Sequence, residues 1–101
     1  MATLHHNISG EITAELVEPG LSAQVSSISI ANIHDDTACY VDLYIEKIST
    51  GKFYFFKNLD LPSGTTLIKS ISFNNAKNQF GLYIKLTKSA SETPAVDVIL
   101  Q

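Results

Sequence analysis

The 101-residue sequence contains no tryptophan and no arginine, and it has only one cysteine and one methionine. A single cysteine excludes a disulfide framework and a cysteine-based zinc site. Without arginine, and with a net charge of -3, the chain lacks the basic surface that binds a nucleic-acid backbone. Charged residues make up 17% of the chain, against roughly 25% in an average soluble domain. The chain is therefore mildly acidic, weakly charged and not expected to bind nucleic acid.

Long hydrophobic runs are also missing. The longest, Phe53–Phe56, is closed by Lys52 and Lys57, whereas a membrane helix needs about 18 apolar residues. The first seven residues have neither the basic nor the apolar region of a secretory signal. We therefore expect no membrane partner and folding in a cytoplasm. Cys39, inside an alternating segment, fits a small buried hydrophobic residue.

What the chain does contain is a hydrophobic content of 45%, too high for disorder, and a length that allows one domain. Polar and apolar residues alternate with period two, which is typical of half-buried strands. In the clearest case, Cys39, Val41, Leu43 and Ile45 form one face, opposite Tyr40, Asp42, Tyr44 and Glu46. The pattern predicts strands at residues 12–17, 25–33, 38–46, 53–56, 66–73, 80–86 and 96–100, with an eighth at 4–9 if that segment pairs.

Seven or eight short strands spaced by about ten residues indicate an all-β fold. We predict a single antiparallel β-sandwich, Ig-like or jelly-roll-like, in preference to a barrel. Residues 1–9 would form an N-terminal arm or a first strand, and residues 10–101 the sandwich domain. The loop at 48–52, which ends in glycine and lysine, predicts a hairpin between the strands on either side.

Motifs that carry catalysis or metal binding are scarce. His34-Asp35-Asp36 resembles part of a metal site, but it falls between two strands, where these residue types favour turns. Only His5 and His6 could add nitrogen ligands, so we predict a solvated turn and no metal. The sequence has no nucleophile-elbow, dinucleotide-binding or phosphate-loop motif. We therefore expect no enzyme, no catalytic residues and no cofactor.

The most informative segment is the aromatic run between Lys52 and Lys57. Strict alternation places Phe53 and Phe55 on one face of the strand, and Tyr54 and Phe56 on the other. The run indicates either a central strand covered on both sides or a contact surface for another subunit, since Tyr and Phe favour interface cores. A sugar-stacking platform is less favoured, because tryptophan is absent. The candidate protein-interface residues, taken with the outward face of the preceding strand, are Tyr40, Tyr44, Tyr54 and Phe56.

A family resemblance covers roughly residues 10–100. It begins with Ser-Ile-Ser-Ile-Ala-Asn at 27–32 and continues with Cys-Tyr-Val-Asp-Leu-Tyr-Ile-Glu at 39–46. An aromatic strand and the loop Leu-Pro-Ser-Gly-Thr-Thr-Leu at 61–67 follow. In this order the segments resemble the small one-domain β-sandwich virion proteins of tailed phages, especially those of marine and cyanobacterial hosts.

The resemblance implies a non-enzymatic structural subunit, most simply a capsid decoration or cement protein on the outer head surface. A head–tail connector, neck or tail protein is the alternative within the virion. The implied partners are the major capsid protein or other virion subunits, with copies of the chain as an oligomer or lattice. The implied location is the virion, assembled in the host cytoplasm. Outside this class, an Ig-like carbohydrate-binding or adhesion module remains open, and a hydrolase would need a pocket joining His34 to an acid and a serine.

Overall fold

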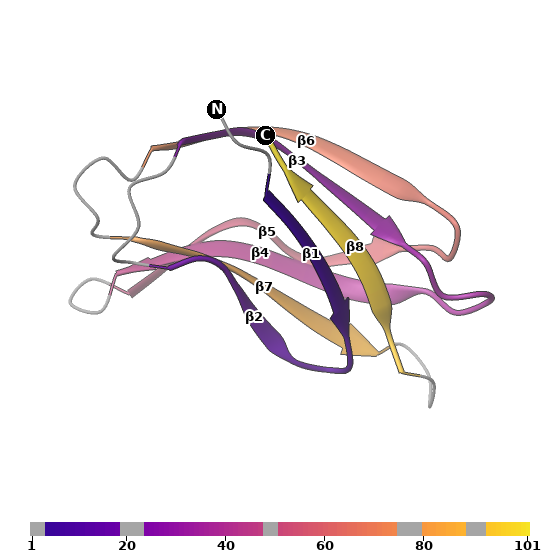
Figure 1. The fold of residues 1–101 in the computed structure, drawn as a ribbon. Coiled ribbons are helices and arrows are strands. Elements are labelled where there is room, and N and C mark those ends of the chain that lie inside the picture. The colour runs from indigo at the N-terminus through magenta and orange to yellow at the C-terminus, as the bar shows by residue number, and fades with distance from the viewer. Residues whose placement is uncertain (1–3, 19–23, 48–50, 75–79, 89–92) are drawn as a thin grey trace.

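The computed structural model describes residues 4–18, 24–47, 51–74, 80–88 and 93–101, and these form eight strands (Figure 1). All seven predicted strands and the eighth at residues 4–9 are present. The strands are β1 (Leu4–Ser9), β2 (Thr13–Val17), β3 (Gln24–Asn32), β4 (Cys39–Lys47), β5 (Gly51–Leu61), β6 (Thr66–Asn74), β7 (Gly81–Lys88) and β8 (Ala95–Leu100).

The strands form two four-stranded antiparallel sheets that lie face to face (Figure 1). Sheet A has the order β1-β8-β3-β6, and sheet B has the order β2-β7-β4-β5. The pairing is nested, because β4 pairs with β5, β3 with β6, β2 with β7 and β1 with β8. Eight strands in this double-sheet arrangement make a jelly roll. The predicted all-β sandwich is confirmed, and of the two sandwich types the jelly roll is the one observed.

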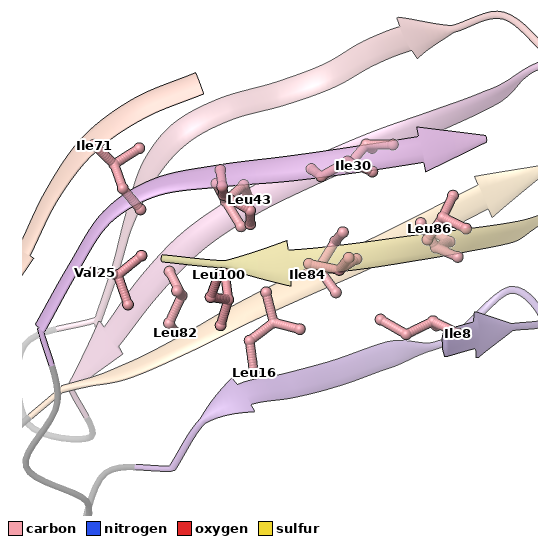
Figure 2. Close-up of a cluster of buried hydrophobic side chains, with 14 of the residues drawn as sticks. Ile8, Leu16, Val25, Ile30, Leu43, Ile71, Leu82, Ile84, Leu86 and Leu100 are labelled. Atoms are coloured by element: carbon pink, nitrogen blue, oxygen red, sulfur yellow. The ribbon is translucent and has the colours of Figure 1, made fainter. Parts of the chain in front are cut away.

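The core lies between the two sheets and is made by the inward residue of each alternating pair (Figure 2). The predicted inward face of β4 is confirmed, with Cys39, Val41 and Leu43 fully buried. Each fully buried aliphatic side chain contributes roughly 1.5–3 kcal/mol relative to exposure. The principal extents of 41 × 28 × 18 Å fit two sheets stacked about 10 Å apart. No membrane-spanning helix is found among the described residues.

β4 and β5 pair as the predicted hairpin, although residues 48–50 of its loop lie outside the described residues. β5 runs from Gly51 to Leu61, far beyond the predicted 53–56, and it forms an edge of sheet B. The interpretation of the aromatic run as a central strand is therefore wrong. The β4–β5 register shifts on both sides of the Leu43–Phe56 pair, and Asn58, with a φ of 53°, lies in the shift between Phe56 and Leu59. Each shift inserts unpaired backbone and changes which face the following side chains occupy.

Asn32, at the end of β3, fastens two inter-sheet connections. Its side-chain amide donates hydrogen bonds to the carbonyl oxygens of Thr37 (3.1 Å) and Leu61 (2.9 Å), and its side-chain oxygen accepts one from the backbone N–H of His34 (3.0 Å). The backbone N–H of Gly64 donates to the Asn32 carbonyl oxygen (3.0 Å). Because Asn32 is buried, these bonds replace water that could not reach it. Asn32 thus ties the β3–β4 loop and the β5–β6 turn to sheet A.

Candidate interaction surface

The outward face of sheet B brings together three tyrosines from three adjacent strands. Tyr44 of β4 stands opposite Tyr54 of β5 and opposite Tyr83 of β7. The ring centroids of Tyr44 and Tyr54 are 5.1 Å apart with planes tilted by 46°, and those of Tyr44 and Tyr83 are 5.5 Å apart and stacked. Such aromatic pairs add about 0.5–1.5 kcal/mol each beyond the area they bury. We call Tyr44, Tyr54 and Tyr83 the tyrosine cluster.

Two lysines of β5 cover the tyrosine cluster. The Lys52 ammonium lies 5.0 Å from the centroid of the Tyr44 ring, and the Lys57 ammonium lies 5.2 Å from that of Tyr54. At such exposed positions a cation–π contact contributes about 0.5–1 kcal/mol. The lysines that flank the aromatic run in sequence therefore each lie over a ring of the tyrosine cluster. They also place charge on an edge strand, which discourages indiscriminate strand pairing.

Gly81 makes room for the third ring. A Cβ atom at Gly81 would lie 2.6 Å from the Tyr83 hydroxyl oxygen and 2.7 Å from two ring carbons. The Tyr83 ring therefore lies directly over the Gly81 backbone, on the same strand and two residues away. This position orients Tyr83 toward its stacking partner Tyr44 and requires a residue without a side chain at 81.

Burial and neighbouring carboxylates hold two of these hydroxyl groups in the protonated form. Burial raises the pKa of Tyr44 above 10.0, and Glu46 reinforces the shift, while Lys52 and a hydrogen bond with Thr13 oppose it. Burial also raises the pKa of Tyr83, and a charge interaction and a hydrogen bond with Glu15 add to it. Tyr44 and Tyr83 therefore keep their hydroxyl protons to higher pH than a free tyrosine does.

The exposed part of the patch is narrower than the cluster itself. Tyr44 is only 3% exposed because the other two rings and Lys52 cover it, whereas Tyr54 is 41% exposed. Tyr40 is also exposed on the outward face, opposite Asp60 of β5. Of the predicted interface residues, Tyr40 and Tyr54 are exposed, whereas Tyr44 is buried and packs against Tyr54.

The prediction that Phe56 shares the outward face with Tyr54 is wrong. Register shifts on either side of Leu43 place Phe56 opposite that buried residue, where it packs against the core. Period-two alternation in the sequence does not reveal an inserted residue, so the pattern assigned Phe56 to the wrong face of β5. Phe53 lies opposite Ile45 and is exposed, with its ring centroid 6.3 Å from that of Phe80.

Tyr83 was missing from the predicted interface residues. Its alternation with Leu82 and Ile84 does place it on an outward face. The sequence pattern does not predict that β7 lies beside β4, because that pairing joins segments about forty residues apart. The one local signal in the sequence was Gly81, two residues before Tyr83, since a glycine inside a strand often marks a place where another group packs closely against the backbone.

The predicted solvated turn at 34–36 has a definite geometry. The Nδ1 atom of His34 accepts hydrogen bonds from the backbone N–H groups of Asp36 (3.2 Å) and Thr37 (3.1 Å). His34 Nδ1 thus stabilises the turn itself. No group of three His, Cys, Asp or Glu side chains able to hold a metal ion is found among the described residues.

An open hollow of about 300 Å³ lies over β1 and β8. Its amide and carboxylate groups already bond to each other, because Asn7 Nδ2 donates to Asp97 Oδ1 at 2.6 Å. Asn7 and Asp97 therefore already satisfy each other within this hollow. The lining residues are His5, His6, Asn7, Asp97, Val98 and Ile99.

No protein-family model and no curated protein matches the chain. Among solved structures, PirA is similar at 12% identity with a TM-score of 0.62, covering 96% of this chain and 92% of that chain. A Yersinia pseudotuberculosis-derived mitogen is similar at 12% identity with a TM-score of 0.56, covering 99% and 83%.

A chain of the cyanophage Pam1 capsid asymmetric unit is similar at 12% identity with a TM-score of 0.54, covering 98% of this chain and 81% of that chain. At these identities the likeness concerns the fold. The sandwich predicted from sequence is thus a fold that this chain shares with a cyanophage capsid structure, a mitogen and PirA.

Proposed function

We propose that this protein is a non-enzymatic structural subunit of a phage virion, and specifically a capsid decoration protein on the outer head surface. The observation that carries the proposal is the near full-length fold likeness to a chain of the cyanophage Pam1 capsid asymmetric unit. The order of strand segments in the sequence points the same way independently. The major capsid protein is the expected partner, and assembly in the host cytoplasm is the expected route.

The outward face of sheet B is the surface proposed to contact the capsid. Tyr54 and Tyr40 present aromatic area with little conformational entropy to lose, and Lys52 and Lys57 provide a charged margin. A decoration protein repeats each contact many times over a symmetric shell. A modest interface of about 800 Å² per partner then suffices, because avidity multiplies it.

The test is loading onto particles of the phage that encodes the sequence, grown without this protein. Tyr54→Ala is expected to reduce occupancy at least tenfold while the variant stays folded. Ile68→Ala is the matched control, because Ile68 is 73% exposed on the outward face of sheet A. Full loading of Tyr54→Ala would refute the sheet B assignment, and loss with Ile68→Ala alone would move the interface to sheet A.

Copy number separates decoration from the neck or tail alternative. A head-surface subunit is expected in hundreds of copies per particle, and a neck subunit in six or twelve. Quantitative mass spectrometry of purified particles gives this number. Absence of the protein from purified particles would refute the virion role altogether.

The carbohydrate-binding alternative is weakened by the geometry of the tyrosine cluster. A sugar stacks on an open ring face, but the Tyr44 ring is buried between its neighbours and Lys57 covers part of Tyr54. We therefore expect no saturable signal on a glycan array. Saturable binding that Tyr54→Ala abolishes would favour the adhesion module instead.

A further inference from the structure

The four edge strands of the sandwich are not equally protected. β2, β5 and β6 pair with their neighbours through ladders that contain register shifts, whereas the β1–β8 ladder is regular from Leu4 to Ser9. Bulges and charges on an edge strand prevent it from pairing with other chains. β1, at the margin of sheet A beside β8 (Figure 1), has no bulge in its ladder.

Charge is distributed in the same way. β5 carries Lys52 and Lys57, and β2 carries Glu15. On β6, Lys69 pairs with the fully buried Ile28, so its side chain leaves from the inward face of the edge. An inward-directed lysine is one of the established devices that protect an edge. β1 reads Leu-His-His-Asn-Ile-Ser, without lysine, acid, proline or glycine.

The hydrogen bonds around β8 identify which backbone groups of β1 remain open. Gly10 N–H donates to the Pro94 carbonyl oxygen (2.9 Å), whereas Gln101 exchanges two bonds of 3.0 Å with Ser27 of β3. The backbone N–H and C=O groups of even-numbered residues of β8 therefore form hydrogen bonds with β1, and those of odd-numbered residues form them with β3. Because bonded pairs alternate along an antiparallel ladder, the backbone N–H and C=O groups of the even-numbered residues of β1 point toward β8.

It follows that the backbone N–H and C=O groups of His5, Asn7 and Ser9 point away from β8. Within the described part of the chain, no hydrogen bond is formed by the backbone of these three residues on that side. Their side chains are exposed on the outward face. β1 thus presents an ordered row of three donors and three acceptors at an uncharged edge.

We propose that β1 pairs antiparallel with β1 of a second copy of this chain, about a two-fold axis through Asn7. A strand is complementary to itself in this orientation, and the odd residues then pair with one another. Asn7 meets the second copy's Asn7, and His5 meets the second copy's Ser9. Sheet A becomes continuous across two molecules, and no two ionisable side chains stand directly opposite each other in this register.

The size of this contact predicts a weak association. The paired edges form about six backbone hydrogen bonds, against roughly ten in a typical protein interface. Isolated molecules are therefore expected to dimerise only at high concentration, and molecules held side by side on a larger assembly to do so readily. The proposal does not depend on the virion role.

A disulfide trap tests the pairing and its register. Directly opposed residues of a bonded antiparallel pair have Cα atoms about 5.5 Å apart, within the range that a disulfide spans. Mild oxidation of Asn7→Cys should give a covalent dimer on a non-reducing gel. The matched control is Ser70→Cys, which is exposed at the opposite edge of sheet A and should remain monomeric. Cys39 is buried and should not contribute.

Sedimentation equilibrium of the untagged chain provides the second measurement. Ser9→Pro removes an outward N–H twice per dimer and leaves the β1–β8 bonds in place, so the dissociation constant should rise at least tenfold with an unchanged melting temperature. Equal crosslinking of Asn7→Cys and Ser70→Cys would overturn the proposal, as would a monomer at every concentration. Neither outcome bears on particle loading by Tyr54, so this proposal and the proposed function fail separately.

Discussion

Tyr44 and Tyr54 stand directly opposite each other on β4 and β5, yet one is buried and the other exposed. The difference arises because β4 is an interior strand and β5 an edge. Tyr44 has a ring on each side and Lys52 above it, whereas Tyr54 has a neighbouring strand on one side only. The pair therefore joins a buried residue that stabilises the sheet to an exposed residue that is free to meet solvent or a partner.

Alkaline pH should destabilise the fold through Tyr44 and Tyr83. Their pKa values are raised in the folded chain, so the folded state binds these protons more tightly than the unfolded state. The resulting stability is present below pH 10.0 and is lost as pH rises through the folded pKa.

The measurement is the free energy of unfolding by denaturant at about pH 8 and about pH 11. Tyr44→Phe should lose less stability between the two pH values than the unmodified chain does. Tyr40→Phe, which is exposed on the same strand, is the control for the loss of one hydroxyl group. Identical losses in all three chains would contradict the assignment.

Gly81→Ala should destabilise the protein by about 1–3 kcal/mol, because the new methyl group displaces the Tyr83 ring from its stack on Tyr44. The cost should nearly vanish in a Tyr83→Ala background, where no ring covers position 81. A double-mutant cycle measured by denaturant unfolding isolates this coupling. Additive effects of the two substitutions would show that the ring and the glycine are independent.

Asn32→Ala should cost about 3 kcal/mol, a large part of the 5–15 kcal/mol typical of small domains. The substitution removes the three side-chain hydrogen bonds that Asn32 makes with two carbonyl oxygens and with the His34 N–H at the end of sheet A. Asn7→Ala, which removes an exposed amide hydrogen bond, is the control and should cost less than about 1 kcal/mol. Thermal unfolding compares the two, and similar melting temperatures would argue against the role of Asn32.

His6→Leu should stabilise the chain by about 1–2 kcal/mol. His6 pairs with the buried Val98, and its buried Nε2 atom finds no hydrogen-bond partner among the residues that the structure describes. In a domain of this size the gain corresponds to a rise of roughly 4–8 °C in melting temperature per kcal/mol. His5→Leu, on the exposed face of the same strand, should change stability by less than about 0.5 kcal/mol. A drop in melting temperature for His6→Leu would indicate that the imidazole has a structural function.

Local alternation was sufficient to locate the strands and to assign the buried face of β4, because side chains in a strand must alternate between core and solvent. It failed at Phe56, where a shifted register breaks the alternation without changing composition. It also could not supply the neighbours of Tyr44, since the contact with Tyr83 depends on the order of strands in the sheet. The role of Asn32 was hidden for the same reason, as its side-chain partners lie in the loop after β3 and at the end of β5.

The nested pairing of the strands has a kinetic consequence. Of the four nested pairs, only β4–β5 joins strands that follow each other in sequence. Each further pair encloses a longer stretch of chain, up to the pairing of Leu4 with Leu100. Such non-local contacts slow folding to roughly milliseconds to seconds. At a synthesis rate of about 5–20 residues per second, β1 would wait roughly 5–20 s on the ribosome for β8. The strand made first is thus the last to be secured, and its edge becomes an ordered template only when folding is complete.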